Sequence, residues 1–251
     1  MKPFSYADYE SQLMDANYIQ MLQRPRTRFF KGCKRVLDLA CGPGIFLELL
    51  REAGIDALGV DRNEEIVRKA QQKGLNALRS DIFDYLEKND ERFDGMFCSH
   101  LLEHLPFERV VRLIELIGSR LEKRGTLVIV LPNPGSIRLH LFGFWRDPEH
   151  VRFYTGNLIA SVCQHYGLKI EYSSEEEVPN LLETPRLGPI SLPPTSRKGL
   201  FPRRKDEKEL LLREFNRQVE VFNQKIEKFS EALNKIWSRD DEVVFACRKI
   251  E

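Results

Sequence analysis

An apolar segment that leads into a glycine-containing turn and then into a second apolar segment constrains this chain most. Residues 35–40 are mainly apolar but include Asp38, and Gly42 and Gly44 follow them. From residue 45 onward, apolar residues recur at helical spacing. The pattern predicts a buried strand, a tight loop and a helix, an arrangement that binds ligands in parallel sheets. Because glycine has no Cβ, such a loop lets a ligand approach the backbone closely.

A second acidic residue follows this loop at a distance typical of nucleotide-binding units. Asp61 ends the apolar segment 57–60, roughly 20 residues beyond the loop, where a carboxylate reaches ribose hydroxyls. The dinucleotide fold has a third glycine where this chain has Leu47. Asp38 ahead of the loop suits a ligand with an ammonium group, which S-adenosylmethionine carries and NAD lacks. The pattern therefore favours S-adenosylmethionine as the cofactor.

The chain around these two segments alternates between strand and helix patterns. Such alternation predicts a parallel sheet that is covered by helices on both faces. Apolar residues between Val110 and Leu121 recur at helical spacing, so we expect a helix that ends at Gly125. A fully apolar strand at residues 126–131 is expected to follow that helix.

Four segments, in order, resemble the motifs of one enzyme family. They are residues 36–44, Gly59–Asp61, Ser80–Ile82 and Phe93–His100. Together they resemble the Rossmann-like (class I) S-adenosylmethionine-dependent methyltransferases, and the resemblance covers residues 34–172. It implies an α/β fold with a seven-stranded, mostly parallel sheet whose last strand is antiparallel. It also implies an enzyme that transfers a methyl group and releases S-adenosylhomocysteine.

The resemblance implies which residues bind the cofactor, and all of them lie near the carboxyl ends of the predicted strands. They are Asp38, Ala40, Gly42, Gly44, Asp61, Arg62, Asp81, Ile82, Ser99, His100 and Leu101. In this assignment Asp61 accepts both ribose hydroxyls and Asp81 accepts the adenine amino group. Each of these two acids could instead cap the helix that follows it, because aspartate is a favoured N-cap residue.

Residues 100–104 allow two interpretations. They spell H-x-x-E-H, which is also a zinc-protease motif. A zinc site needs both histidines on one face of a stable helix, whereas a predicted strand leads into His100 and Pro106 disfavours helical geometry before it. We therefore expect no metal. In the resembled family a similar segment borders the reaction site, so His104 is a candidate catalytic residue, and a purely structural hydrogen bond is its alternative role.

The aromatic and basic segment at residues 144–153 is the second specific feature. It is similar to a segment of polysaccharide-assembly enzymes, such as the methyltransferase part of O-antigen chain-terminating methyltransferases. Aromatic rings stack on sugars, arginine pairs with phosphate or carboxylate, and histidine can take a hydroxyl proton. His150 and Arg152 are therefore candidate catalytic residues, unless the segment folds on itself through a salt bridge from Arg152 to Asp147. The predicted function is O-methylation of a small or glycan-type acceptor at a sugar hydroxyl, phosphate or carboxylate.

Two additions flank the predicted cofactor-binding domain, which comprises residues 34–172 and 240–251. Residues 1–33 are expected to form an N-terminal helical lid, or a helix on the sheet edge, and one of its arginines could hold the cofactor carboxylate. Residues 173–239 predict an insertion with a Pro- and Gly-rich loop and a long helix at 206–237.

The apolar stripe of this long helix must pack on something, because an isolated helix is marginally stable in water. Its own domain is the favoured partner, and a homodimer contact or a peripheral membrane contact are the alternatives. A rival function follows from this helix: a non-catalytic binding subunit of the methyltransferase fold that acts through residues 206–237.

Composition restricts which other kinds of function and location the sequence predicts. The net charge of +1 provides no field that would recruit nucleic acid. The five cysteines form no C-x-x-C pair, so we expect neither zinc nor a disulfide framework. The sequence has no apolar run of about 18 residues and no signal peptide, which predicts a cytoplasmic location.

Overall fold

The computed structural model describes residues 9, 15–176, 187–189, 203–237 and 241–250, and the chain divides into two compact units. The first unit comprises residues 1–178 and 240–251, and the second comprises residues 179–239. Most of the predicted lid before residue 15 and most of the predicted loop in the insertion lie outside the described residues. The division into a lid, a cofactor-binding domain and an insertion therefore remains a prediction.

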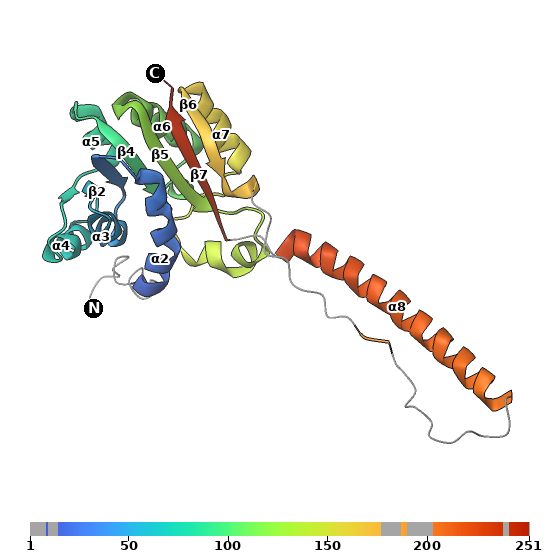
Figure 1. Ribbon diagram of the computed structural model, residues 1–251. Coiled ribbons are helices and arrows are strands. Elements are labelled where there is room, and N and C mark those ends of the chain that lie inside the picture. The colour runs from blue at the N-terminus through green and yellow to red at the C-terminus, as the bar shows by residue number, and fades with distance from the viewer. Residues whose placement is uncertain (1–8, 10–14, 177–186, 190–202, 238–240, 251) are drawn as a thin grey trace. The chain divides into compact units, whose positions relative to one another are not determined.

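The first unit is built on a seven-stranded sheet with the order β3-β2-β1-β4-β5-β7-β6 (Figure 1). The strands from β1 to β5 pair in parallel, and β7 runs antiparallel to both β5 and β6. This sheet confirms the predicted Rossmann-like methyltransferase fold class. The strands are β1 Arg35–Leu39, β2 Asp56–Asp61, β3 Ala77–Arg79, β4 Phe93–Ser99, β5 Leu121–Pro132, β6 Leu168–Ser173 and β7 Glu242–Lys249.

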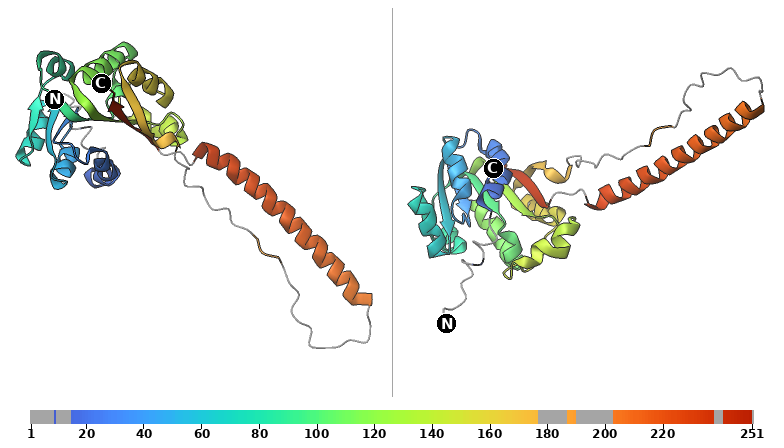
Figure 2. Two further views of the ribbon diagram at one scale, coloured as in Figure 1. Left: turned by 45° about the horizontal axis from the view of Figure 1, so that its top comes forward. Right: turned by 90° about the horizontal axis from the view of Figure 1, so that it is seen from below.

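Helices cover both faces of this sheet (Figures 1 and 2). They are α2 Ala16–Gln23, α3 Ile45–Glu52, α4 Glu64–Gln72, α5 Ile82–Lys88, α6 Phe107–Arg120 and α7 Gly156–His165. The short helical segments are η1 Arg24–Phe30, η2 Leu102–His104, η3 Leu139–Gly143, η4 Phe144–Arg146 and η5 Ser174–Glu176. Successive side chains of a strand point to opposite faces. Leu37 and Leu39 of β1 thus share a core with α5, α6 and α7, whereas Val36 packs with η1 and α3.

The glycine turn after β1 serves two purposes. Gly44 has a left-handed φ of 80° at the start of α3, and a Cβ there would lie 2.5 Å from Leu75 Cδ1. Gly44 therefore lets the helix begin tightly against its neighbour. Gly42 has a φ of 53°, and no atom lies within 4 Å of where its Cβ would be. The space beside Gly42 is thus open to a ligand.

We predicted that the helix containing Val110 would end at Gly125, and this prediction is wrong. α6 ends at Arg120, and β5 begins at Leu121. Leu121 is fully buried and pairs with Phe93 of β4, and the register of the two strands shifts before Gly95. Burial of Leu121 in the sheet therefore decided this boundary, although the local spacing of apolar residues favoured a longer helix.

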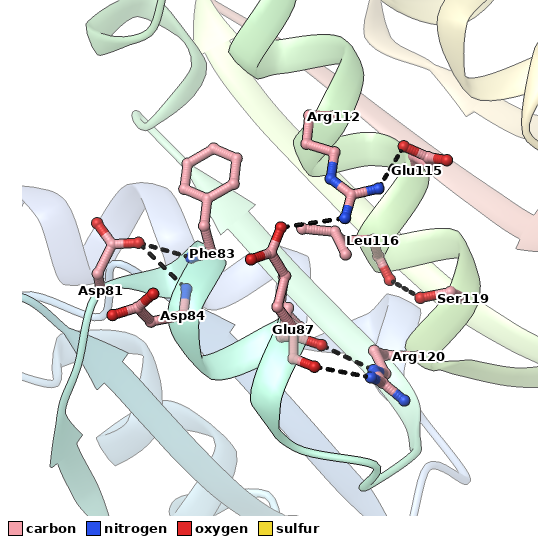
Figure 3. Close-up of polar contacts among 10 residues, drawn as sticks. Asp81, Phe83, Asp84, Glu87, Arg112, Glu115, Leu116, Ser119 and Arg120 are labelled. Atoms are coloured by element: carbon pink, nitrogen blue, oxygen red, sulfur yellow. Dashed lines mark hydrogen bonds and ion pairs between the residues drawn. The ribbon is translucent and has the colours of Figure 1, made fainter.

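Polar contacts fix α5 against α6 and place Asp81 at the edge of the sheet (Figure 3). Asp81 is the N-cap of α5 and accepts hydrogen bonds from the backbone N–H groups of Phe83 (2.8 Å) and Asp84 (3.3 Å). Arg120 of α6 donates to the Leu86 carbonyl oxygen at 2.8 Å, so the two helices hold one another in register.

The second unit contains α8, Arg203–Trp237, one continuous helix of 35 residues (Figure 1). Asn223 of α8 is 4% exposed and bonds twice to the backbone of Leu187, accepting from its N–H at 3.1 Å and donating to its carbonyl oxygen at 3.0 Å. None of the helices in the described part of the chain combines the length and the apolar character needed to span a bilayer.

Candidate active site

A cleft of about 710 Å³ opens at the carboxyl ends of β1, β2 and β4. Many of the predicted cofactor residues line it, together with one candidate catalytic residue. They are Ala40, Gly42, Asp61, Arg62, Asp81, Ile82, His100, Leu101 and His104. Its volume lies within the range usual for small-molecule sites. The structure therefore brings residues from the four sequence motifs to one place.

Five predicted site residues lie outside the wall of this cleft. Asp38 is buried at the end of β1, Gly44 packs towards Leu75, and Ser99 ends β4 with its hydroxyl buried and unpaired among the described residues. His150 lines a neighbouring cavity, and the Arg152 guanidinium lies 5.1 Å from the centre of the Tyr154 ring. The aromatic segment is thus not closed by the salt bridge to Asp147 that we considered.

Asp61 connects the second strand to the glycine turn. Its Oδ2 accepts the Gly42 N–H at 3.1 Å, and its Oδ1 accepts the Asn63 N–H at 2.8 Å. Asn63 is the N-cap of α4, as its side chain accepts from the N–H groups of Glu65 and Ile66. Asp61 is therefore not the cap of this helix, and it holds the loop so that its carboxylate borders the cleft.

Asp61 in the wall of the cleft and the buried Asp38 next to it together favour a positive charge at this end of the cleft. Burial, and then the neighbouring Asp61, raises the pKa of Asp38 well above its usual range. A cation bound close to these two carboxylates would lower that pKa again, because an opposite charge favours the ionised form. The pair thus suits a ligand with an ammonium or sulfonium group.

The sequence left two roles open for Asp81, a helix cap and a cofactor contact, and its position allows both. It caps α5 through Oδ1 and also lines the cleft, so Oδ2 remains available at the site edge. Arg62 lies on the same wall and pairs with Glu149 of the aromatic segment. This ion pair connects the wall of the cleft to residues 144–153.

His100 stands at the centre of a charged network. Its Nδ1 lies 3.1 Å from Glu103 Oε1, and its Nε2 lies 2.6 Å from Glu242 Oε1. Glu242 also accepts a hydrogen bond from Arg26, whose Nη1 is buried without a partner among the described residues. The left-handed φ of 51° at His100 turns the chain here, directly after β4. The network joins η1, the end of β4 and the start of β7.

The network shifts the pKa values of two of its members. Burial lowers the pKa of His100, but hydrogen bonds to Glu103 and Glu242 raise it more, to about 10. Burial raises the pKa of Glu242, but His100 and Arg26 lower it more, to about 2. These contacts favour the imidazolium form of His100 at neutral pH, which disfavours His100 as a proton acceptor.

We expect Glu242→Gln to remove a pH-dependent part of the stability. The raised pKa of His100 stabilises the fold fully below about pH 6.5, and this contribution is lost as the pH rises through about 10. The lowered pKa of Glu242 contributes above about pH 4.5 and is lost as the pH falls through about 2. Because the His100 side chain is 42% exposed, we expect a loss of only about 1–2 kcal/mol at pH 6.

Urea unfolding of the wild type and the variant at pH 6 and pH 10 would measure this difference. The difference should shrink at the higher pH as His100 loses its proton, but it should not vanish, because the variant also lacks the ion pair from Glu242 to Arg26. Glu171→Gln is the matched control, since Glu171 pairs with Arg248 in an exposed ion pair of the same sheet edge. An equal loss at both pH values would mean that the His100–Glu242 contact does not control stability.

A second cavity of about 650 Å³ meets the cleft at His100, which lines both. Its wall contains arginine and aromatic side chains from η1, η4 and β6. They include Arg26, Arg28, Phe29, Phe144 and Tyr172. The Arg28 guanidinium lies 4.8 Å from the centre of the Phe29 ring and 5.2 Å from that of Tyr172. This cavity could therefore hold an acceptor with a ring and an anionic group.

His104 and His150 meet where the two cavities adjoin. Their ring centres are 4.7 Å apart; His104 lines the cleft and His150 lines the second cavity. His150 Nδ1 lies 2.7 Å from the Phe144 carbonyl oxygen, which can only accept, so Nδ1 carries the proton and Nε2 is free to accept one. Burial lowers the pKa of His104, which keeps its ring neutral at pH 7.

Glu103 adds a carboxylate to this histidine pair. Side-chain ligand atoms of Glu103, His104 and His150 all lie within 4.8 Å of one another, and Glu103 Oε2 is buried without a hydrogen bond from the described residues. The three side chains could hold a divalent cation as well as transfer a proton. From the sequence we expected no metal. An experiment that distinguishes cation binding from proton transfer at these side chains is described in the Discussion.

Three residues of the network were not among the predicted site residues. Glu103 stood inside the H-x-x-E-H segment, but Glu242 lies at the start of the last strand with no motif around it. Arg26 belonged to the arginines at 24–28, and the sequence could not single it out. Only the packing of η1 and β7 beside His100 identifies Arg26 and Glu242.

Comparison with known proteins decides the family. A family model described as a methyltransferase domain matches residues 9–173, more than half of the 251 residues. This chain belongs to that methyltransferase family. The methyltransferase resembles a crystal structure of a SAM dependent methyltransferase from Archaeoglobus fulgidus, with 29% identity, a TM-score of 0.68, and coverage of 94% of this chain and 95% of that one.

Two further matches are more limited. The methyltransferase is 39% identical over 79 residues to the ubiquinone biosynthesis O-methyltransferase of Coxiella burnetii, a match that covers 29% of this chain and only 33% of that protein. A chain from the complex between the Haloferax volcanii Trm112 methyltransferase activator and the putative methyltransferase matches fully in length, with 14% identity and a TM-score of 0.63. The latter likeness shows the fold alone.

The protein is an S-adenosylmethionine-dependent methyltransferase, and its cleft fits this cofactor. The open space beside Gly42 allows close approach of a ligand, and the two carboxylates of Asp38 and Asp61 suit its positive charges. Membership of this enzyme family favours an enzyme over the rival interpretation of a non-catalytic binding subunit. The individual contacts of the predicted residues with the cofactor remain predictions.

Proposed function

We propose that this methyltransferase methylates an oxygen of a small or glycan-type acceptor, which is a sugar hydroxyl, a phosphate or a carboxylate. The observation that carries the proposal is the position of the His104–His150 pair between the cofactor cleft and the second cavity. A proton acceptor at that point lies beside both reactants. The similarity of 79 residues to an O-methyltransferase supports the same reaction class.

The protein's contribution is to position the reactants and to accept a proton. When bound, S-adenosylmethionine supplies a methyl group on a sulfonium, which leaves as a neutral thioether. For a hydroxyl acceptor, His150 Nε2 takes the hydroxyl proton as the new carbon–oxygen bond forms. Asp147 Oδ2, which lies 3.8 Å from that nitrogen, stabilises the resulting imidazolium. A phosphate or carboxylate acceptor needs no base and would instead use Arg28 of the second cavity.

Arg26 is our candidate for the group that holds the cofactor carboxylate. It is 6% exposed, and Glu242 fixes its Nη2 while Nη1 is left without a partner among the described residues. A buried guanidinium N–H without a partner is costly, and a carboxylate would satisfy it. In this arrangement Asp61 accepts from the ribose, Asp81 and Ile82 border the adenine, and Ser99, His100 and Leu101 pass beneath the sulfonium.

The polysaccharide role rests on the aromatic and basic character of residues 144–153. Phe144 stacks on Phe153 with ring centres 3.7 Å apart, while Trp145 is 63% exposed. An exposed indole beside the second cavity suits a sugar face. On this basis we include a role in cytoplasmic polysaccharide biosynthesis in the proposal, together with a contact of the insertion with a membrane surface or a second copy of the chain.

A transfer assay with S-adenosylmethionine that carries a labelled methyl group tests this function. The acceptors to compare are nucleotide-linked sugars, lipid-linked sugars, small phenols and sugar phosphates. We expect label in an alkali-stable ether for a sugar hydroxyl, and in an alkali-labile ester for a carboxylate. Transfer only to nitrogen or sulfur acceptors would contradict O-methylation.

A further inference from the structure

The helix α8 carries an apolar stripe with strict heptad spacing. Its residues are Leu212, Phe215, Val219, Phe222, Ile226, Phe229, Leu233 and Ile236. They alternate by three and four over the whole stretch, which is the spacing that a coiled coil requires. We propose that this stripe, called the heptad stripe below, pairs with the heptad stripe of a second copy of this chain in a two-helix coiled coil.

Within the second unit, the described residues leave the phenylalanines of the stripe exposed and cover Leu212, Val219 and Ile226 in part. Phe215 and Phe222 are each 50% exposed, and Phe229 is 64% exposed. A large exposed apolar surface usually marks an interaction site. Asn223 and Leu187 do cover part of one flank of α8, through their two hydrogen bonds. The three phenylalanines nevertheless remain open, so a partner has room to pack on them.

The charges around α8 do not oppose such pairing. The positions that flank the heptad stripe are Leu211, Asn216, Gln218, Asn223, Lys225, Ser230, Ala232 and Trp237, of which only Lys225 is charged. Two such helices therefore bring no acid against an acid and no row of like charges together. The outward positions hold the other charges and form local pairs, such as Arg217 with Glu214 at 2.7 Å.

The same charges disfavour a membrane surface as the partner. Residues 208–231 contain five basic side chains (Lys208, Arg213, Arg217, Lys225, Lys228) and five acidic ones (Glu209, Glu214, Glu220, Glu227, Glu231). Helices that lie on anionic membranes instead present a polar face rich in lysine and arginine. Over the whole of α8, nine basic and seven acidic side chains leave a net charge of only +2, so the helix gains little from an anionic bilayer.

Length and pattern identify the partner as α8 of a second copy. The next longest described helix, α6, has 14 residues and already buries its apolar face in the sheet. Within the described part of the chain, α8 alone offers a free heptad stripe of matching length. Most of the stability of a helix in a protein comes from packing of its apolar face, so pairing would stabilise both copies.

The test is the oligomeric state of the full chain, measured by sedimentation equilibrium over a range of protein concentrations. We expect a mass of two 29.3 kDa chains for the wild type. Phe222→Asp places a charge inside the heptad stripe and should weaken dimerisation by at least about 100-fold, because an unpaired buried charge is costly. Gln224→Asp is the matched control: it adds the same charge two residues away on the outward face and should leave the dimer intact.

Cofactor binding and circular dichroism show whether each variant is folded, and Phe229→Asp repeats the test if Phe222→Asp does not fold. A monomeric wild type would overturn the proposal, whether or not it binds vesicles of anionic phospholipid. Equal dissociation of the Phe222 and Gln224 variants would overturn the role of the stripe. Neither result would affect the proposed methyl transfer, which the transfer assay measures separately.

Discussion

Replacing both His104 and His150 with alanine is expected to reduce turnover with a hydroxyl acceptor by about 10²–10⁴-fold, the usual contribution of a general base. Affinity for S-adenosylhomocysteine should stay within about twofold of wild type, because neither ring carries a predicted cofactor contact. His150→Ala alone should cost more than His104→Ala, since His150 Nε2 is the free acceptor and Asp147 lies 3.8 Å from it.

Single-turnover transfer of a labelled methyl group, together with calorimetry of cofactor binding, measures the two effects separately. His165→Ala is the matched control, as His165 is exposed at the end of α7, away from both cavities. Normal turnover of the double variant would remove the base from the mechanism. Loss of cofactor affinity in a folded variant would place the pair in the cofactor site instead.

A chelator distinguishes proton transfer from metal binding at the same side chains. If His150 is a base, removal of divalent cations by EDTA should leave turnover unchanged. Loss of turnover that returns on addition of magnesium or zinc would mean that Glu103, His104 and His150 hold a cation, as their ligand atoms within 4.8 Å of one another allow. The function as a methyltransferase would stand, but the base would be replaced by a metal.

Asp61→Ala is expected to weaken binding of S-adenosylhomocysteine by about 1–3 kcal/mol, as for the loss of hydrogen bonds to a charged acceptor. That range corresponds to a roughly 5–150-fold higher Kd. The effect has two sources: the ribose loses its acceptor, and the Gly42 N–H loses the bond of 3.1 Å that holds the loop. Asp61→Asn keeps one acceptor oxygen and should lose less.

Calorimetric titration measures these affinities directly. Asp56→Ala is the matched control, because Asp56 lies exposed at the opposite end of β2. Unchanged affinity in Asp61→Ala would exclude Asp61 from the ribose role. An equal loss in the alanine and asparagine variants would mean that the negative charge matters more than the hydrogen-bond geometry.

Much of the site could be predicted because a parallel sheet collects the ends of its strands at one edge. Asp61, Asp81 and His100 each follow a strand that the apolar pattern located, so they had to lie near one another. The roles were harder to predict, because one aspartate can both cap a helix and face a ligand. Asp81 does cap α5, whereas Asn63 rather than Asp61 caps α4.

The sequence alone determined the order of strands and helices, the glycine turn and the family motifs, since these depend on local periodicity and on residues close in the chain. Tertiary structure alone decided features that depend on distant partners. Leu121 became strand because it could be buried against Phe93, and Arg26 and Glu242, 216 residues apart, meet beside His100. No local pattern can encode such a contact, because its energy exists only once the sheet has brought η1 and β7 together.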